Sequence, residues 1–436
     1  MEWYMVLLLI FVGLIAIMFT GLPIAFSFLL VSSIVMFFLM GEFGIRQLVL
    51  GMYDSLNSFP FTTIPFFMIM GEVFYQSGIV TKTLDTLSLF VRRIPGRLSV
   101  ITLIAGGVFA ALSGSVVANV AMFGALMLPE MMRRGYDKSL IAGSIMASGA
   151  LAMVIPPSAI AVLLGGIAQI SVGKILIGSI LPGVVLVIFY IGYVVISTVR
   201  KPSLAPVYEV GHVSTSEMFR AALVDILPLF FIFLLVMGLI FLGVATPTEA
   251  SALGALGALI LTVFYRRFSL KLVYDSLLNS LKVTAMILMI IAGSAGFSQI
   301  LALTGASREA VAAILALPVS SMVILSLMLC ITILLGFFME QTAIMMITLP
   351  LFMPIVNALG FDQVWFAVLI LICLQIGQLT PPVGLALFTM KGVAPPEVTM
   401  GDIYRGAVPY VILDIIVLVL LVLVPSIITF LPNLGT

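Results

Sequence analysis

The chain has 436 residues, of which 63% are hydrophobic and only 8% are charged, and its formal net charge is +1. No soluble domain of this size covers its surface with so few charges, and no basic tract suggests a nucleic-acid partner. Many segments hold the ~20 apolar residues that are needed to cross ~30 Å of hydrocarbon. The predicted fold class is therefore an all-α polytopic membrane protein.

In the first half, residues 1–198, Gly, Pro and clusters of charge divide the apolar segments. Scaffold helices are expected within 1–60. The expected elements are two spans (4–20 and 24–40), an interfacial segment (42–58), a span (61–77), an amphipathic segment (80–93), an apolar stretch (98–132), a helix (139–168) and a last span (176–198). Ser113-Gly114-Ser115 interrupts the apolar stretch, and Pro156-Pro157 breaks the helix that follows.

A polar linker over 199–224, predicted to be cytoplasmic, leads to residues 225–436, where the same order of segments recurs. The expected elements there are scaffold helices and an amphipathic arm (225–282), a span (283–304), an interrupted apolar stretch (319–358), a helix broken at Pro381-Pro382 (363–390) and a final span (407–430). Pro129 and Pro354 share their offset with the two Pro-Pro pairs. Two repeats with broken helices at matching positions indicate a transporter whose site lies between them, near the bilayer midplane.

The basic residues predict the topology, because cytoplasmic loops collect Lys and Arg. All of them except Arg46, Lys174 and Arg308 fall in five clusters: 82–97, 133–138, 200–220, 266–282 and 391–405. With these clusters in the cytoplasm, both termini face the periplasm, and the stretch 98–132 enters and leaves by one face. That stretch is then a re-entrant hairpin, and 319–358, which has no Lys or Arg, is a hairpin from the opposite face. The two repeats therefore have inverted topology, and their hairpin tips meet where protein or water must satisfy the broken backbone.

The first hairpin tip carries several polar atoms. The hydroxyls of Ser113 and Ser115, the amide of Asn119 and the freed carbonyls are hard oxygen ligands that suit a small cation. The helix that starts after the tip also directs its positive end at the site, which favours an anion. The alternative is that Ser113-Gly114-Ser115 only allows helices to pack closely.

Each Pro-Pro pair removes two backbone donors and frees carbonyls in the preceding turn. The carbonyls nearest the breaks belong to Ala152 and Ile155 in the first half and to Gly377 and Thr380 in the second. A sodium ion facing the hairpin tip would give them a partner. The alternative is a simple kink whose carbonyls are satisfied by Ser and Thr side chains.

Glu340-Gln341-Thr342 lies in the second hairpin, where a carboxylate is costly unless it has a function or a partner. Three roles are open for Glu340: binding a cation, binding a proton, or capping the helix that starts at Thr342. Neither hairpin tip and neither Pro-Pro break holds Lys, Arg or His, which favours cation-coupled uptake of an anion and also fits a neutral substrate. The residues predicted to contact substrate are Ser113, Gly114, Asn119, Ser158, Gln341, Gln375 and Gln378.

An enzyme is not predicted. The only histidine, His212, lies in the polar linker, so a zinc site of the H-E-x-x-H type is impossible and a Ser-His dyad would need His212 to reach the middle of the membrane. There is no phosphate-binding loop of the Gly-x-x-x-x-Gly-Lys-Ser/Thr type.

In combination, several motifs resemble the large membrane subunit of tripartite ATP-independent periplasmic (TRAP) transporters. They are Ile64-Pro65-Phe66-Phe67, Gly71-Glu72, Leu112 to Ser115, Gly135-Tyr136-Asp137, Ile155 to Ser158, Gly336 to Glu340 and Leu379 to Leu385. The resemblance covers essentially the whole chain. It implies a bacterial or archaeal inner-membrane importer with an elevator-type scaffold and transport domain. Its implied partners are a small four-helix membrane subunit, expected as a separate polypeptide, a soluble periplasmic binding protein and a small organic acid.

The resemblance also implies coupling to sodium, with about two Na⁺ ions bound transiently. One site would be formed by Ser113, Ser115, Ala152, Ile155 and Pro157. The other would be formed by Gly336, Thr342, Gly377 and Thr380, with Glu340 as a further candidate. Similar members commonly have Gly at the place of Ala152, a change that a backbone carbonyl ligand survives. The predicted function is thus sodium-coupled import of a small carboxylate or sulfonate, and the alternative is a stand-alone cation-coupled carrier that needs no binding protein.

Overall fold

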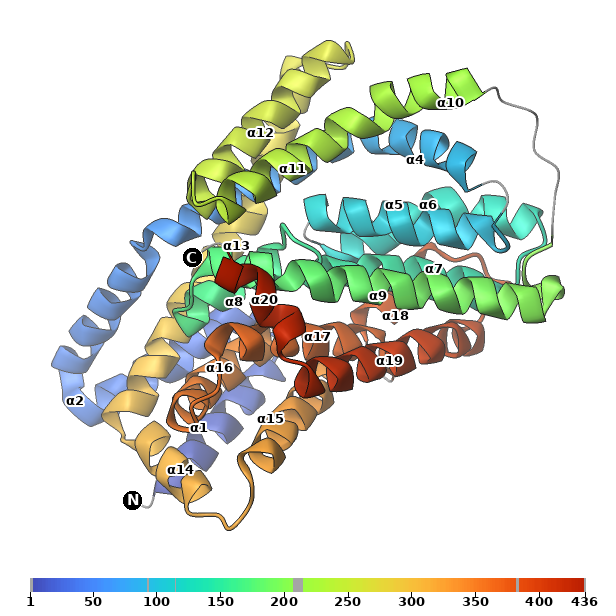
Figure 1. Cartoon of the computed structure of the whole chain (residues 1–436). Helices are drawn as coiled ribbons and strands as arrows, with labels where there is room; N and C mark the ends of the chain where they lie inside the picture. The colour runs from blue at the N-terminus through green and yellow to red at the C-terminus, as the bar shows by residue number, and fades with distance from the viewer. Residues whose placement is uncertain (1–2, 92–93, 114, 207–214, 382–383, 435–436) are drawn as a thin grey trace.

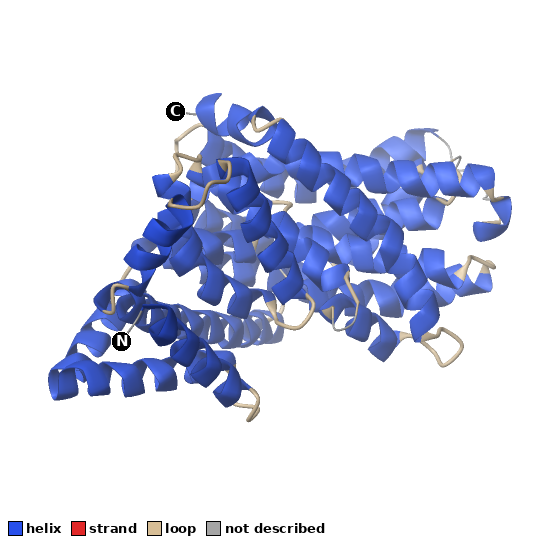
Figure 2. Ribbon diagram, turned by 90° about the horizontal axis from the view of Figure 1, so that it is seen from below, coloured by secondary structure: helices blue, strands red, loops and turns tan. Residues whose placement is uncertain are grey.

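The structure is a computed structural model that describes residues 3–91, 94–113, 115–206, 215–381 and 384–434 (Figure 1). Within these ranges every regular element is a helix and there is no strand (Figure 2). Eight of the described helices are long and apolar enough to cross a membrane. The predicted all-α, multi-pass class is therefore confirmed.

The chain begins with two helices that carry few charges. The first elements are α1 (Trp3–Met18), α2 (Ile24–Leu56), the 3₁₀ turn η1 (Phe59–Thr62), α3 (Thr63–Gln76) and α4 (Ile79–Phe90). The expected span 24–40 and segment 42–58 are the two parts of α2, which meet at a non-helical kink at Gly41. Gly41 has φ 60° and ψ −141°, a conformation that only glycine adopts readily.

The first interrupted stretch and the first broken helix follow. They form α5 (Arg97–Ser113), α6 (Val116–Arg133), α7 (Lys138–Ala150), the 3₁₀ turn η2 (Leu151–Met153), α8 (Ala159–Ala168), α9 (Val172–Arg200) and the turn η3 (Pro202–Leu204). The interruption between α5 and α6 lies where the Ser-Gly-Ser motif predicts it. The break between η2 and α8 contains Pro156 and Pro157, which are joined by a cis peptide bond.

In the described residues of the second half, the regular elements are also helical. They are α10 (Thr215–Ala221), the π-helical turn η4 (Ala222–Ile226), α11 (Leu227–Phe241), α12 (Pro247–Phe264), α13 (Leu270–Leu303), α14 (Ala306–Leu315), α15 (Ser321–Gly336), α16 (Gln341–Ala358), α17 (Gln363–Leu379), α18 (Leu385–Val393), α19 (Met400–Leu423) and α20 (Ser426–Leu434). The expected arm and the span 283–304 are continuous in α13, because no Gly or Pro interrupts 270–292. The expected final span ends early, at Leu423, before Pro425.

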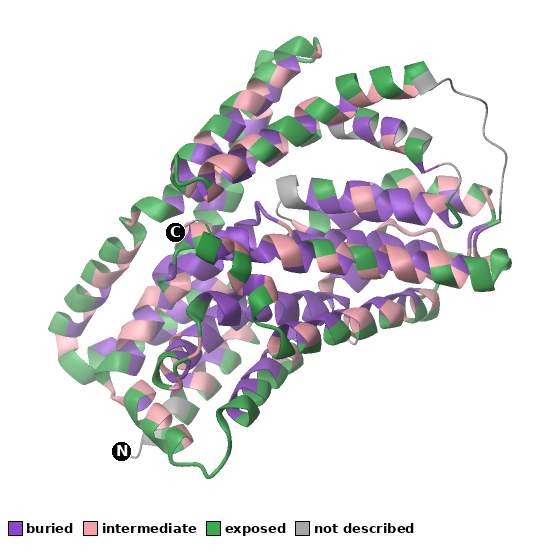
Figure 3. Ribbon diagram, in the orientation of Figure 1, coloured by how far each residue is buried: buried purple, intermediate pink, exposed green. Residues whose placement is uncertain are grey.

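The outer helices of the two halves pack against one another. α2 lies along α13, where the rings of Phe28 and Phe297 meet edge to face with centroids 5.2 Å apart. α3 lies along α12, and the buried hydroxyls of Thr63 and Thr248 are joined by a 2.8 Å hydrogen bond. Helices from both halves therefore build one outer group, and Figure 3 shows many exposed residues along these helices.

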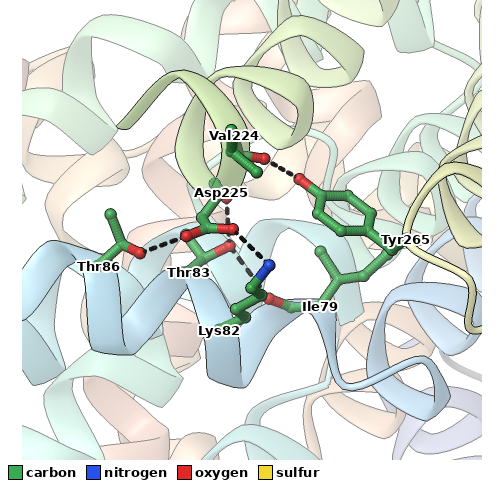
Figure 4. Close-up of polar contacts among 7 residues, drawn as sticks. All are labelled: Ile79, Lys82, Thr83, Thr86, Val224, Asp225 and Tyr265. Carbon is green, nitrogen blue, oxygen red and sulfur yellow. Dashed lines mark hydrogen bonds and ion pairs between the residues drawn. The ribbon is translucent and has the colours of Figure 1, made fainter. Parts of the chain in front are cut away.

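A polar cluster fastens α4 to this outer group (Figure 4). The Lys82 ammonium lies 2.9 Å from the Asp225 carboxylate, which also accepts a 2.8 Å hydrogen bond from the Thr86 hydroxyl. The Thr83 hydroxyl donates to the main-chain carbonyl of Asp225, and the Tyr265 hydroxyl donates to the main-chain carbonyl of Val224. Partial burial, together with the nearby Asp225 carboxylate, raises the pKa of Tyr265, so its hydroxyl remains a donor. The cluster joins α4, η4 and the α12–α13 turn.

A second group of helices, the inner group, surrounds α7 and α17 and includes α5, α6, α8, α9, α15, α16, α18 and α19. In α17 every residue from Val364 to Leu379 is buried, and buried residues dominate α5 and its neighbours in Figure 3. α7 and α19 approach so closely that a Cβ on Gly143 would lie 2.3 Å from the carbonyl oxygen of Gly406. In Figure 1 this group occupies the centre and right, with α2, α12 and α13 along its left and upper edge.

Candidate functional site

A cavity of about 760 Å³ lies between the two groups of helices. One wall is formed by α3 and α13. The opposite wall is formed by α6, the start of α8 and the start of α16. The polar residues of the lining are Glu72, Tyr75, Ser115, Asn279, Ser280, Glu340, Gln341 and Thr342. The two interrupted stretches, far apart in sequence, therefore contribute their tips to one cavity.

The first tip contributes Ser115. Its hydroxyl accepts a 3.2 Å hydrogen bond from the backbone N–H of Ala118 and so caps α6. The Ser113 side chain and Gly114 lie outside the described residues. Asn119 is buried away from the lining, and its amide donates a 2.8 Å hydrogen bond to the carbonyl of Gly106 on α5. Asn119 thus fastens the two helices of the hairpin to each other.

The second tip contributes Glu340, Gln341 and Thr342. The Glu340 carboxylate accepts hydrogen bonds from the backbone N–H of Thr342, at 2.9 Å, and from the Thr342 hydroxyl. The Glu340 carboxylate therefore caps α16, which is one of the three roles that the sequence leaves open for it, beside binding a cation or a proton. The Gln378 amide donates to the Gln341 side chain, which connects this tip to the end of α17.

A serine side chain forms hydrogen bonds with part of the backbone at the first Pro-Pro break. The Ser158 hydroxyl donates to the carbonyl of Ala152 at 2.8 Å and caps α8 by accepting from the N–H of Ala161 at 3.3 Å. A carbonyl oxygen has two lone pairs, so Ala152 retains one that a cation can use. Ala152, Ile155, Pro157 and Ser158 are not part of the described lining of the cavity.

Two of the second group of predicted ion ligands, Gly336 and Gly377, are in contact. A Cβ on Gly336 would lie 2.7 Å from the Cα of Gly377, so α15 and α17 pack closely at these two glycines. Thr380 follows three residues later and donates its hydroxyl to the carbonyl of Ile376 at 2.6 Å. Pro382 lies outside the described residues, and Thr342 lies at the cavity wall.

Gln375 lies apart from the cavity. Its amide nitrogen is 2.9 Å from the Tyr190 hydroxyl oxygen and 3.0 Å from a carboxylate oxygen of Asp414. After Gln363 at its start, α17 is apolar on every side except at Gln375 and Gln378, so its sequence has no pattern to show which side faces the cavity.

The described lining of the cavity holds two carboxylates, Glu72 and Glu340, and no Lys, Arg or His. Three helices, α6, α8 and α16, begin at the cavity, and their N-termini supply partial positive charge. An anion in this cavity would therefore rely on helix N-termini, hydroxyls, amides and bound cations. Glu72 and Ser280 line the cavity but were not predicted from the sequence as ion or substrate contacts. The hydroxyl of Ser280 is buried and has no hydrogen-bond partner among the described residues. The four-residue spacing of Ser276, Ser280 and Thr284 on one face of α13 is the signal that could have found it.

Residues 11–427 match the family described as tripartite ATP-independent periplasmic transporter, DctM component. The chain belongs to this DctM family. Relatives include the C4-dicarboxylate TRAP transporter large permease protein DctM of Pseudomonas aeruginosa, 30% identical over 89% of this chain and 90% of that protein. The isethionate TRAP transporter permease protein DctMQ of Oleidesulfovibrio alaskensis is 30% identical over 93% of this chain, which spans only 63% of the relative.

Among solved structures, the crystal structure of the Alcanivorax borkumensis YdaH transporter, reported to have an unusual topology, superposes with a TM-score of 0.64. It is 16% identical and covers 88% of this chain and 89% of its own, so the likeness concerns the fold. The DctM-family relatives are transporter permeases, and this agrees with the prediction that the chain is a membrane transport component and not an enzyme.

Proposed function

We propose that this DctM-family chain imports a small organic anion, a carboxylate or sulfonate, by coupling its entry to sodium. The observation that carries the proposal is the meeting of both hairpin tips, at Ser115 and Glu340, in one cavity of about 760 Å³. That volume lies within the roughly 300–1,000 Å³ of ordinary small-molecule sites. The names of the relatives, a C4-dicarboxylate and an isethionate permease, support a small carboxylate or sulfonate.

The charge of the lining supports coupling to a cation. An anion beside Glu72 and Glu340, with no basic side chain in the described lining, needs positive charge from elsewhere. Two Na⁺ ions supply it. One binds at Ser113, Ser115, Ala152, Ile155 and Pro157, and the other binds at Gly336, Thr342, Gly377 and Thr380. The second carbonyl lone pair at Ala152 and the contact of Gly336 with Gly377 are compatible with these sites.

The two walls of the cavity suit an elevator movement. The α3 and α13 wall belongs to the outer group of helices, and the opposite wall belongs to the hairpins and broken helices. On α6 this opposite wall presents Ala118, Ala121 and Ala125, whose small side chains offer little obstruction to sliding, beside the larger Met122 and Leu126. The hairpins and broken helices of two inverted repeats, 1–198 and 225–436, move together, while the outer helices stay in place.

The complex contains two further proteins. A small four-helix membrane subunit covers exposed apolar faces of the outer helices, and a periplasmic binding protein delivers the substrate. The length of the DctMQ relative, which extends well beyond the match, is consistent with a second membrane component in that protein. The complex lies in the bacterial or archaeal inner membrane, with both termini of this chain in the periplasm.

Uptake into proteoliposomes tests the proposal. The chain and its small partner are reconstituted, the cognate binding protein is added outside, and small carboxylates and sulfonates are offered with an inward sodium gradient. We expect uptake that requires both sodium and the binding protein. Uptake that persists without the binding protein would instead support the stand-alone carrier, and uptake that ignores sodium would refute the coupling.

A further inference from the structure

Three helices of the inner group meet at a completely buried carboxylate, Asp414 on α19. One of its oxygens, Oδ1, accepts a hydrogen bond from the Tyr190 hydroxyl on α9. The same oxygen accepts a 3.0 Å hydrogen bond from the amide of Gln375 on α17, which also contacts Tyr190 at 2.9 Å. All three side chains are inaccessible to solvent. The cavity and the predicted ion sites do not include this cluster.

The cluster contains more acceptors than donors. The other carboxylate oxygen, Asp414 Oδ2, and the amide oxygen, Gln375 Oε1, are both buried and have no hydrogen-bond partner among the described residues. Tyr410, one turn earlier on α19, packs edge to face on Tyr190 with ring centroids 4.9 Å apart, and its hydroxyl is also buried without a partner. Buried polar atoms of this kind are rare in folded proteins and need an explanation.

No basic side chain in the described part of the chain forms an ion pair with Asp414. The titratable side chains around it are the phenols of Tyr190, Tyr193 and Tyr410. The elements packed on α19 are α7, α9, α17, α18 and α20. α17 and α20 have no charged residue, and those of α7, α9 and α18 lie near the helix ends, at Lys138, Lys174, Arg200 and Lys391. On α19 itself the nearest basic residue, Arg405, is nine positions away, which is about 13 Å along a helix. An ionised Asp414 would therefore be a lone charge in the protein interior, which is strongly unfavourable.

We propose that Asp414 is a proton-binding site, occupied as a neutral carboxylic acid that donates its Oδ2–H to Gln375 Oε1. One proton then removes the isolated charge and supplies the missing donor for the amide oxygen. The amide and the acid form a two-pronged pair, because the Gln375 nitrogen already donates to Oδ1. The Tyr190 hydroxyl completes the cluster, which holds α9, α17 and α19 together in the inner group. This inference goes beyond the proposed function and does not depend on coupling to sodium.

Infrared spectroscopy of the purified protein at neutral pH tests the protonation directly. A protonated carboxyl group has a carbonyl band that a carboxylate lacks, and the band shifts in D₂O. We expect this band in the wild-type protein and its loss in Asp414→Asn, whereas Asp54→Asn, a change at an exposed aspartate, keeps it. Wild-type and Asp414→Asn spectra without a difference in this band would overturn the proposal. If the variant does not fold, isotope-labelled aspartate shifts the same band in the wild-type protein.

Thermal unfolding provides a second readout. Near neutral pH the folded chain holds one proton that an unfolded aspartate would release, so the stability contributed by Asp414 must fall as the pH rises. We expect the melting temperature of the wild-type protein to fall at alkaline pH by more than that of Asp414→Asn, whose amide cannot lose a proton. A fixed difference between the two proteins at all pH values would overturn the proposal. So would a sodium-dependent rise in melting temperature that Asp414→Asn abolishes, because it would assign the site to a metal cation.

Discussion

The contact between Gly336 and Gly377 permits a quantitative prediction for Gly336→Ala. The added Cβ would lie 2.7 Å from the Cα of Gly377 and 3.6 Å from its nitrogen. Carbon atoms pack at about 3.5–4.0 Å, so the end of α15 must move away from α17 by about 1 Å. The obstructing atom belongs to the main chain and cannot rotate aside. Overpacking of this kind costs about 1–3 kcal/mol.

The same displacement would disturb the proposed second sodium site, because metal–ligand distances tolerate changes of only about 0.2 Å. If the cost falls on the ion-bound state, 1–3 kcal/mol corresponds to about a 5- to 150-fold rise in the sodium concentration needed for half-maximal uptake. Uptake measured against sodium concentration in proteoliposomes gives this value. Gly238→Ala is the control, because a Cβ there meets nothing within 4 Å and alanine favours a helix. A wild-type sodium curve in Gly336→Ala, with unchanged stability, would refute the reasoning.

Three further substitutions test other parts of the cavity. Ser115→Ala removes the cap of α6, which costs about 0.5–2 kcal/mol, and we expect sodium activation of uptake to weaken; an unchanged sodium curve would exclude Ser115 from the ion site. Glu340→Gln keeps an oxygen that can cap α16 but removes the charge, so we expect lower uptake with a nearly unchanged melting temperature. Uptake at the wild-type rate would leave Glu340 with a capping role alone. Ser280→Ala removes from the cavity wall a hydroxyl that has no partner among the described residues. We expect KM for substrate to rise about 2- to 10-fold, which corresponds to the loss of one hydrogen bond. Ser276→Ala, a change outside the lining, is its control.

Much of the fold could be predicted from the sequence, because glycine, proline and charge mark where membrane helices stop. Ser113-Gly114-Ser115 and the region from Gly336 to Thr342 interrupt apolar stretches at the places where α5 meets α6 and α15 meets α16. The extent of α13 was not predicted, because the cluster that ends at Lys282 was interpreted as the end of an arm. A charge can lie on the exposed side of a continuous helix, and Lys282 does so.

The lining of the cavity was harder to predict. Reasoning about the hairpin tips led to Ser115, Glu340, Gln341 and Thr342, which share the cavity wall, but the wall from α3 and α13 was not anticipated. Pairing between helices distant in sequence is set by tertiary packing, and a single sequence has no direct record of it. Gln375 illustrates the same difficulty, because its environment depends on Tyr190 and Asp414, which lie on two other helices.

The central claim is that the cavity between the hairpin tips is the transport site, and cysteine protection tests it most directly. Ala121→Cys, in the wall formed by α6, is introduced after Cys330 and Cys373 have been replaced by alanine. Its reaction with a small membrane-permeant thiol reagent is followed with and without sodium and the acid identified in the uptake assay. The account predicts that sodium and the acid together slow the labelling and that the reagent blocks uptake, while Ala312→Cys on exposed α14 reacts at one rate throughout. The account would be contradicted if neither sodium nor the acid changed the labelling rate of Ala121→Cys and uptake remained intact after modification.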